Sequence, residues 1–594
     1  MSSSTSNHYS SIVTIDDTNS KVGTPSLGDV GQPISKKGTS IPTEDGGTLH
    51  VQPFRRPGSK QLRAVVTFVP RPSRFDSSDS GAEQFRGFYT LFWIFCTLLS
   101  VKTIVYHHKE TGSLLSLTFA NVMSKDLFSL LLSEMVLTFT SLFAVVLVKA
   151  FKRGYVRYYW TGVVIQHVYQ TIMLAAAITW TFNRQWAWVQ SGYFTLRCLV
   201  LLMKIHSYLA VNGYLQEMDE KATKVEQRLR KLTNKVGGWD QAVSDARARR
   251  EELEQQDTTP SETPSLIKQH SNNYFGQPPA ATALRNRLQN LEVPSVLKRD
   301  LSSNSIATES SFKRAAAPSL PAVGPPSHPL VDHPDKDISS LAHELSELEA
   351  ELTSSHKNKT RWPANLTWAN YVDYQFLPTL VYEIEYPRTD RIRPLYVLEK
   401  TVATFGTFFL LYQYTEHYIM PFVPAPGQTT GQSFVHNLVD LALPFMICYL
   451  ILFYLIFECI CNGFAELSCF ADREFYNDWW NSTSFDQYAR KWNKPVHAFL
   501  LKHVYTSTLS YKAVGKGGAA FLTFLLSACV HELVMAVVTK KIRPYLFVLQ
   551  MSQIPLIALG RVPFIKRNKI LGNTVFWVGL MAGFPLLCVA YCAY

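Results

Sequence analysis

The residue best suited to chemistry is His531, which lies inside the apolar run GGAAFLTFLLSACVHELVMAVV. It is the fifteenth residue counted from Gly517, and at ~1.5 Å of helix rise per residue it would lie near the middle of a bilayer. A charged group at that depth costs roughly 2.5–3.5 kcal/mol, so an ionisable residue there is a candidate functional residue. A neutral imidazole offers a free lone pair for general-base catalysis. The alternative is a histidine that bonds a neighbouring helix for packing alone.

The neighbours of His531 argue against three other chemistries. Glu532 lies about 100° further round the helix, so the two side chains do not share a face. A zinc protease motif needs a second histidine four residues after the first, and HELVM has none. The stretch GKGG (515–518) also lacks the residue spacing of a phosphate-binding loop. Cys529 lies about 200° from His531, which argues against a cysteine nucleophile. We therefore predict no metal site.

A second cluster is the stretch FYNDWWN, in a basic segment before that apolar run. It contains the candidate residues Phe475, Tyr476, Asp478, Trp479, Trp480 and Asn481. The acid and amides can lock a turn and offer hydrogen bonds to a polar substrate group. The alternative is an aromatic anchor at the lipid head groups, because tryptophan is enriched there.

Lys204 and His206, in MKIHSYLAVNGYL, form a third set of polar groups inside an apolar run. They can line a cavity, or neighbouring polar groups can satisfy them. Because buried polar groups are normally hydrogen-bonded, we expect neighbouring polar groups to hydrogen-bond both side chains and to give them a structural role.

The elements that must position these residues are long apolar segments. The chain has 594 residues, of which 47% are hydrophobic and 18% charged, and its nine cysteines lie in or beside apolar runs. Nine runs are close to the ~20 residues that a helix needs to cross a ~30 Å hydrocarbon core. We expect an all-α polytopic membrane protein with about nine transmembrane helices, at 88–106, 127–149, 160–181, 188–214, 396–418, 437–465, 517–539, 543–560 and 572–592.

One polar region precedes the membrane segments, and a second lies between them. Residues 1–84 are rich in Ser, Thr, Gly and Pro and predict a disordered tail. Residues 85–215 hold the first membrane helices, and residues 361–594 hold the second, catalytic membrane portion. Between them, residues 216–360 are charged and largely disordered by composition. Helices are expected within this insert at 217–254 and at 338–353, where leucines recur at helical spacing.

The net charge of +12 has a membrane explanation. The basic residues gather beside apolar runs, which argues against a nucleic-acid partner and favours anionic lipid head groups. Placing most basic loops in the cytosol puts the N-terminus in the cytosol and the C-terminus in the lumen. Lys540, Lys541 and Arg543 break this pattern.

These motifs resemble the membrane-bound O-acyltransferases. FYNDWWN followed by SxxxHEL (527–533) is similar to the branch that holds the sterol and diacylglycerol O-acyltransferases. The stretches at 386–400, 471–505 and 527–551 look most like the fungal sterol O-acyltransferases, and MKIHSYLAVNGYL fits the same subgroup. The resemblance covers residues 85–215 and 361–594.

The resemblance implies transfer of a long fatty acyl group from acyl-CoA to the 3β-hydroxyl of a sterol, and ergosterol or a precursor is the expected sterol. His531 matches the family's catalytic histidine and Asn481 the final Asn of its signature. Lys516 and Ser527 match positions that contact acyl-CoA. The resemblance implies that the other candidate residues of FYNDWWN also belong to the acyl-CoA site. Glu532 matches an acid of unassigned role. The family also implies a homo-oligomer, a dimer or tetramer, in the endoplasmic reticulum membrane, with no cofactor beyond the co-substrate acyl-CoA.

In the expected reaction, His531 removes the sterol proton as the oxygen attacks the thioester, and Asn481 positions the thioester or stabilises the oxyanion. Four cytosolic lysines are expected to meet the CoA phosphates: Lys494, Lys502, Lys512 and Lys516. Three alternatives stay open: a diacylglycerol O-acyltransferase, a transporter with a proton relay through His531 and His206, and an inactive scaffold.

Overall fold

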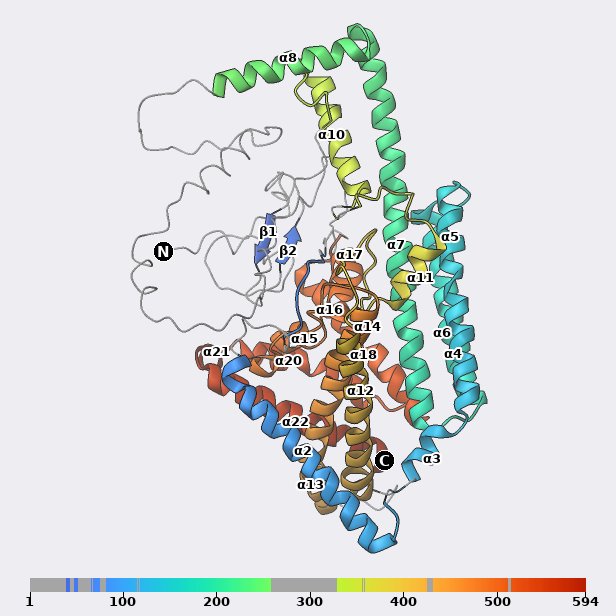
Figure 1. The fold of residues 1–594 in the computed structure, drawn as a ribbon, viewed down its shortest axis with the longest axis vertical. Helices are drawn as coiled ribbons and strands as arrows, with labels where there is room; N and C mark the ends of the chain where they lie inside the picture. Colours follow the sequence, from blue (N-terminus) through green and yellow to red (C-terminus); the bar gives the residue numbers. More distant parts are fainter. Residues whose placement is uncertain are drawn as a thin grey trace. The chain divides into compact units, whose positions relative to one another are not determined.

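The computed structural model describes residues 39–42, 48–51, 66, 68–74, 82–114, 116, 118–257, 328–354, 356, 358–424, 431–510 and 514–593. Most of these residues are helical (Figure 1). They fall into two compact units, one within Met1–Gly213 and Leu366–Tyr594 and the other within Tyr214–Asn365.

Seven helices among the described residues are long and apolar enough to cross a membrane. They are Thr90–Thr111, Leu127–Lys152, Tyr158–Asn183, Trp188–Val236, Phe434–Leu467, Lys516–Thr539 and Lys569–Cys592. Each coincides with a predicted apolar run, because a chain in hydrocarbon must satisfy its own backbone hydrogen bonds and a helix does so. The prediction of an all-α, multi-pass membrane protein is confirmed.

Two of the nine predicted spans are not among these seven helices. The run at 396–418 forms helix α12 (Pro394–Tyr414), but Glu399 and Lys400 lower its mean hydropathy. The run at 543–560 forms a shorter apolar helix, Tyr545–Gly560, in which Ser552 separates α19 (Tyr545–Met551) from α20 (Gln553–Gly560). Its 16 residues are about 24 Å long, which is short for a ~30 Å core.

The membrane unit begins with helices before the polar insert. Helix α7 (Trp188–Thr233) has 46 residues and is about 69 Å long, more than twice the hydrocarbon thickness. Arg197 on α7 pairs with Glu134 on α4 at 2.5 Å. The helices that precede α7 are α2 (Ala82–Thr111), α3 (Thr118–Ser124), α4 (Leu127–Ser141), α5 (Phe143–Lys152) and α6 (Val163–Asn183).

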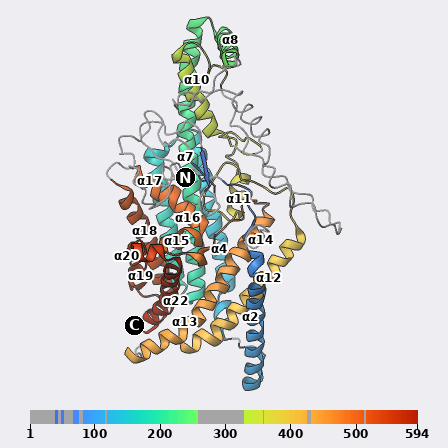
Figure 2. The same cartoon turned by 90° about the vertical axis from the view of Figure 1, so that its left-hand side faces the viewer.

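After the insert, helix α13 (Gly431–Phe453) packs against both α12 and α22 (Figures 1 and 2). It continues through a π-helical segment, Tyr454–Ile460, into α14 (Cys461–Leu467). The remaining helices are α11 (Trp368–Phe376), α15 (Phe485–Trp492), α16 (Lys494–Phe499), α17 (Thr506–Leu509), α18 (Lys516–Thr539), α21 (Pro563–Arg567) and α22 (Lys569–Ala593).

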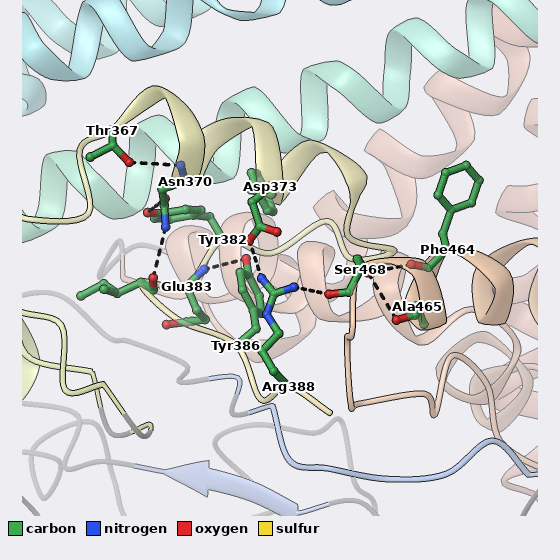
Figure 3. A network of polar contacts seen from close by, with 12 residues as sticks. Thr367, Asn370, Asp373, Tyr382, Glu383, Tyr386, Arg388, Phe464, Ala465 and Ser468 are labelled. Atoms are coloured by element: carbon green, nitrogen blue, oxygen red, sulfur yellow. Dashed lines mark hydrogen bonds and ion pairs between the residues drawn. The ribbon is translucent and has the colours of Figure 1, made fainter. Parts of the chain in front are cut away.

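A polar network ties α11 to the end of α14 (Figure 3). The Thr367 hydroxyl caps α11 by accepting from the Asn370 amide at 3.1 Å. Arg388 pairs with Asp373 on α11 and donates to the Ser468 carbonyl at 2.5 Å, just after α14. The loop that leads toward FYNDWWN therefore leaves α14 from a braced position.

The polar insert contains the two predicted helical regions. Residues 217–254 are covered by the end of α7 and by α8 (Trp239–Asp257), and α10 (Lys336–Leu352) covers the second region. The Asp335 carboxylate caps α10 by accepting from the Asp337 amide at 2.8 Å. Ile338, Leu345 and Leu348 are buried on one face, as the leucine spacing predicts. Residues 258–327 lie outside the described residues.

The expected N-terminal tail departs from the prediction in part. Strands β1 (Thr39–Pro42) and β2 (Thr48–Val51) form an antiparallel pair, with Thr39 opposite Val51. Residues 68–74 are bound to the segment before FYNDWWN, with Arg71 bridged to Asp472. The prediction of a disordered tail is therefore wrong for residues 68–74, because a tertiary contact distant in sequence orders them. Much of the remaining tail lies outside the described residues.

Candidate active site

Helix α18 places three predicted site residues on one face. Lys516 begins the helix, Ser527 follows at about 20° round the axis, and His531 at about 60°. His531 and Lys516 are exposed, and Ser527 is half-buried. Because Lys516 lies about 22 Å along the axis from His531, the face runs from a cation at the helix start to an imidazole about two-thirds of the way along the helix.

The hydrogen bonding of His531 defines its tautomer. Its Nδ1 atom lies 2.7 Å from the Ser527 carbonyl oxygen, which can only accept a hydrogen bond. Nδ1 therefore carries the proton, and in the neutral ring the lone pair is on Nε2. The Ser527 hydroxyl is 3.4 Å from the same Nδ1 atom. The exposed ring can thus offer an accepting nitrogen to a substrate proton.

Glu532 lies on a different face of α18, about 100° from His531. Its carboxylate accepts from the Phe547 amide at 2.9 Å, on α19, and from the Tyr591 hydroxyl at 2.9 Å, on α22. The same hydroxyl lies 2.9 Å from the Arg543 carbonyl oxygen. Glu532 therefore holds α18 against its neighbours, a role that sequence analysis left unassigned. The only signal in the sequence was its position about 100° from His531.

The aromatic residues of FYNDWWN lie inside the protein. Phe475, Tyr476 and Trp479 are at most 2% exposed. The Trp479 ring packs against those of Trp492 and Phe453, with centroids 5.1 and 5.2 Å away. The alternative that Trp479 is a lipid-facing anchor is therefore wrong. These rings form a rigid base for the motif, and the predicted contact with acyl-CoA stays a prediction.

The end of the motif is more open. Asn481 is exposed, and its Nδ2 lies 3.4 Å from the Asp478 carboxylate, which also pairs with Lys491 at 3.2 Å. Trp480, half-buried, presents its carbonyl oxygen to Asn573 Nδ2 of α22 at 2.9 Å. Helix α22 thus supports both this turn and, through Tyr591, helix α18.

The two predicted catalytic residues come from different elements. Asn481 lies in a single 3₁₀ turn, Trp479–Asn481, and His531 lies in α18. Among the contacts of the described residues, no hydrogen bond joins their side chains. The expectation that they act on one substrate stays a prediction.

Below the motif lies a buried charged network. Glu458 is fully buried in the π-helical segment and accepts from the Tyr476 hydroxyl at 2.5 Å and from Asn462 Nδ2 at 3.1 Å. Lys400 lies 3.9 Å from the same carboxylate. Burial, reinforced by Glu458, raises the pKa of Tyr476 well above its ordinary value. Sequence analysis missed this network, although a glutamate within an apolar run was its visible signal.

The lysines expected to meet CoA phosphates are not equivalent. Lys494 pairs with Glu474 at 2.6 Å, and Lys502 pairs with Glu383 at 2.5 Å. Both ammonium groups neutralise carboxylates of the protein itself, and their expected contact with CoA phosphates stays a prediction. Lys512 lies outside the described residues, whereas Lys516 is exposed at the start of α18.

Lys204 and His206 are held by neighbouring polar groups. Lys204 Nζ donates to the carbonyl oxygens of Tyr374 and Leu377 at 2.7 and 2.8 Å. His206 Nδ1 lies 2.9 Å from Gln166 Nε2, an amide nitrogen that can only donate, so this ring nitrogen accepts. The expectation of structural satisfaction is confirmed. That the reaction needs no metal or cofactor stays a prediction.

Comparison with known proteins adds to this geometry. Residues 85–593 match the family model described as MBOAT, membrane-bound O-acyltransferase family. Sterol O-acyltransferase 2 of Candida albicans is 32% identical over 542 residues, covering 89% of this chain and 78% of the relative. Probable sterol O-acyltransferase 1 of Schizosaccharomyces pombe is 32% identical over 540 residues, covering 88% and 85%.

A further relative has another printed activity. Diacylglycerol O-acyltransferase 1 of Dictyostelium discoideum is 34% identical over 238 residues, which cover 39% of this chain and 38% of the relative. The matched family model spans nearly the whole membrane portion, including FYNDWWN and His531. The chain belongs to the membrane-bound O-acyltransferase family and is an acyl-CoA-dependent O-acyltransferase with several membrane-spanning helices.

Proposed function

We propose that this enzyme is a sterol O-acyltransferase, which moves a long fatty acyl chain from acyl-CoA to the 3β-hydroxyl of a sterol. Two relatives with that printed activity align over most of this chain, which supports the choice of acceptor. The observation that carries the chemistry is His531 on an apolar helix, with Nδ1 bound to the Ser527 carbonyl and Nε2 left to accept. Ergosterol or a precursor is the proposed sterol.

The reaction balances around His531. As the sterol oxygen attacks the thioester carbonyl, Nε2 takes the hydroxyl proton and a carbon–oxygen bond forms. The tetrahedral intermediate then breaks its carbon–sulfur bond, and the imidazolium returns the proton to the departing thiolate. The Ser527 carbonyl stabilises the transient imidazolium through Nδ1. The products are a steryl ester and free CoA.

Asn481 is proposed as the group that meets the thioester. Its exposed amide can donate to the oxygen that becomes negative in the tetrahedral intermediate, a contact worth about 3–4 kcal/mol in other acyl-transfer enzymes. Lys516 is proposed to bind a CoA phosphate, because it is exposed and lies on the same face of α18 as His531. Ser527, one turn from His531, completes this face.

We propose that the enzyme lies in the endoplasmic reticulum membrane, with the N-terminus cytosolic and the C-terminus lumenal. The basic loops beside the apolar helices support this orientation. Water-soluble CoA then approaches from the cytosol, while the acyl chain and sterol enter through the membrane. A homo-oligomer, dimer or tetramer, is proposed from the family resemblance.

The second candidate acceptor is diacylglycerol, because a diacylglycerol O-acyltransferase is among the relatives. Microsomes from cells that lack their own sterol esterification are given labelled oleoyl-CoA with ergosterol, with diacylglycerol, or with both. We expect label in steryl ester, and ergosterol should compete against diacylglycerol. Label in triacylglycerol alone would replace the proposed acceptor by diacylglycerol.

A further inference from the structure

A short segment ahead of the first membrane helix binds directly to the FYNDWWN region. We name residues 68–74, FVPRPSR, the N-terminal strap. Arg71 donates its amide to the Ala471 carbonyl at 3.0 Å and accepts at its own carbonyl from the Arg473 amide at 2.9 Å. Pro70 and Pro72 on either side have no N–H and favour an extended chain, so docking orders little additional backbone. The strap therefore binds with little loss of backbone conformational entropy.

Arg71 of the strap pairs with the carboxylates of Asp472 and Glu474. Arg71 Nε and Nη2 donate to the two oxygens of Asp472 at 2.9 and 2.7 Å, and Nη1 pairs with Glu474 at 2.6 Å. Asp472 is only 6% exposed. A buried carboxylate without its cation is costly, and the planar guanidinium fits two oxygens at once. Arg71 thus neutralises the residues that lead into FYNDWWN.

The end of the strap reaches the motif itself. Ser73 is 1% exposed and donates to the buried carboxylate of Glu458, which also accepts from Tyr476 of the motif. Arg74 Nη2 donates to Asn477 Oδ1 at 3.1 Å. The strap therefore contacts Asn477 directly and Tyr476 through one shared acid.

The motif is braced on its other side as well. The Asn477 amide donates to the Lys491 carbonyl at 2.8 Å, and the Lys494 amide donates to the Phe475 carbonyl at 3.0 Å. Residues 472–477 thus lie between the strap and residues 491–494. Beyond this braced segment, the turn closes when the Asn481 amide donates to the Asp478 carbonyl at 3.1 Å. Losing one side would free the start of the turn that carries Asn481.

We propose that the N-terminal strap is a positioning element of the acyltransferase, which acts through Asn481 by fixing the register of residues 472–477. Arg71 and Ser73 are its positioning residues. This inference rests on the proposed role of Asn481 in the reaction. The segment before the first membrane helix thereby supports the turn that carries Asn481.

The first test follows amide hydrogen exchange of residues 471–482 in the full-length purified enzyme, with no substrate present. Arg71→Ala should speed exchange in these residues at least tenfold, and Arg71→Lys should give an intermediate increase because it keeps the charge and loses the paired contacts. Arg230→Gln is the matched control, since Arg230 forms an exposed ion pair with Glu226. Unchanged exchange in Arg71→Ala would overturn the proposal.

The second test is a double-mutant cycle on turnover. Arg71→Ala should lower kcat at least tenfold while the acceptor KM changes less than twofold. In an Asn481→Ala background, the same change should lower kcat less than twofold further, because residues that act as a unit are not additive. Equal losses in both backgrounds would show a general structural effect and overturn the positioning role.

A milder variant keeps the test decisive if Arg71→Ala fails to fold. Ser73→Ala removes one contact to Glu458 and should lower kcat about threefold, with the same lack of additivity toward Asn481→Ala. Full additivity would contradict the proposal. The exchange measurement uses no acceptor, so if the wild-type enzyme does not esterify sterols, the proposed function fails while exchange still decides the strap.

Discussion

The Nδ1 atom of His531 lies 2.7 Å from the carbonyl oxygen of Ser527, one helical turn earlier. This contact assigns the ring proton, because a carbonyl oxygen can only accept. It leaves Nε2 as the accepting nitrogen on the exposed side chain. This nitrogen is the atom that the proposed general-base role requires.

Replacing the base should remove ester synthesis. We expect His531→Ala to lower kcat about 10²–10⁴-fold, the range for general-base catalysis, with little change in the thermal midpoint because the side chain is exposed. The measurement is labelled oleoyl transfer by purified enzyme. Cys529→Ser, an exposed position elsewhere on α18, is the control and should keep normal turnover. Normal esterification by His531→Ala would refute the catalytic role.

Weakening the back of α18 should act on stability first. Tyr591→Phe removes the hydroxyl that joins Glu532 to the Arg543 carbonyl, and should lower the free energy of unfolding by about 1–3 kcal/mol. A thermal-shift assay in detergent checks this expectation. Tyr155→Phe is the comparison, since Tyr155 is 77% exposed. Equal melting midpoints for the two variants would contradict the proposed clamp.

The buried tryptophan of the motif should matter more to stability than an exposed one. Trp479→Ala leaves a cavity among Trp492, Phe453 and neighbouring rings, at a cost of about 3–5 kcal/mol. Trp160→Ala, at a position 79% exposed, should change stability far less. Thermal unfolding of both variants measures the difference, and similar losses would show that Trp479 is not a packing residue.

Two of the lysines expected to meet the CoA phosphates should behave differently. Lys516→Ala should raise the KM for acyl-CoA about tenfold with kcat nearly unchanged, as for loss of one phosphate contact. Lys494→Ala should instead destabilise the fold by about 1–3 kcal/mol, because it removes one of the cations that pair with Glu474 and leaves Arg71 as the other. Steady-state kinetics and thermal unfolding of both variants separate the roles. An unchanged KM in Lys516→Ala would remove that residue from the acyl-CoA site.

The features that depend on local periodicity could be predicted from the sequence. Apolar runs of sufficient length predicted all seven candidate spans of the described residues, and helical spacing predicted the buried face of α10. The family resemblance identified Lys516 and Ser527, and the structure places both within about 60° of His531 on α18. The expected span at 396–418 is a continuous helix that contains Glu399 and Lys400, and the one at 543–560 is a shorter apolar helix, Tyr545–Gly560.

By itself, the sequence determined the membrane class, the position of His531 within a long apolar helix and the family motifs, because hydrophobicity and helical period act between near neighbours. Only the tertiary structure decided which charges are already paired and what braces the motif. Arg71 and Asp472 are 401 residues apart, so no local pattern could connect them. The physical reason is that a buried carboxylate must find a cation wherever the fold brings one, and that choice is made by packing.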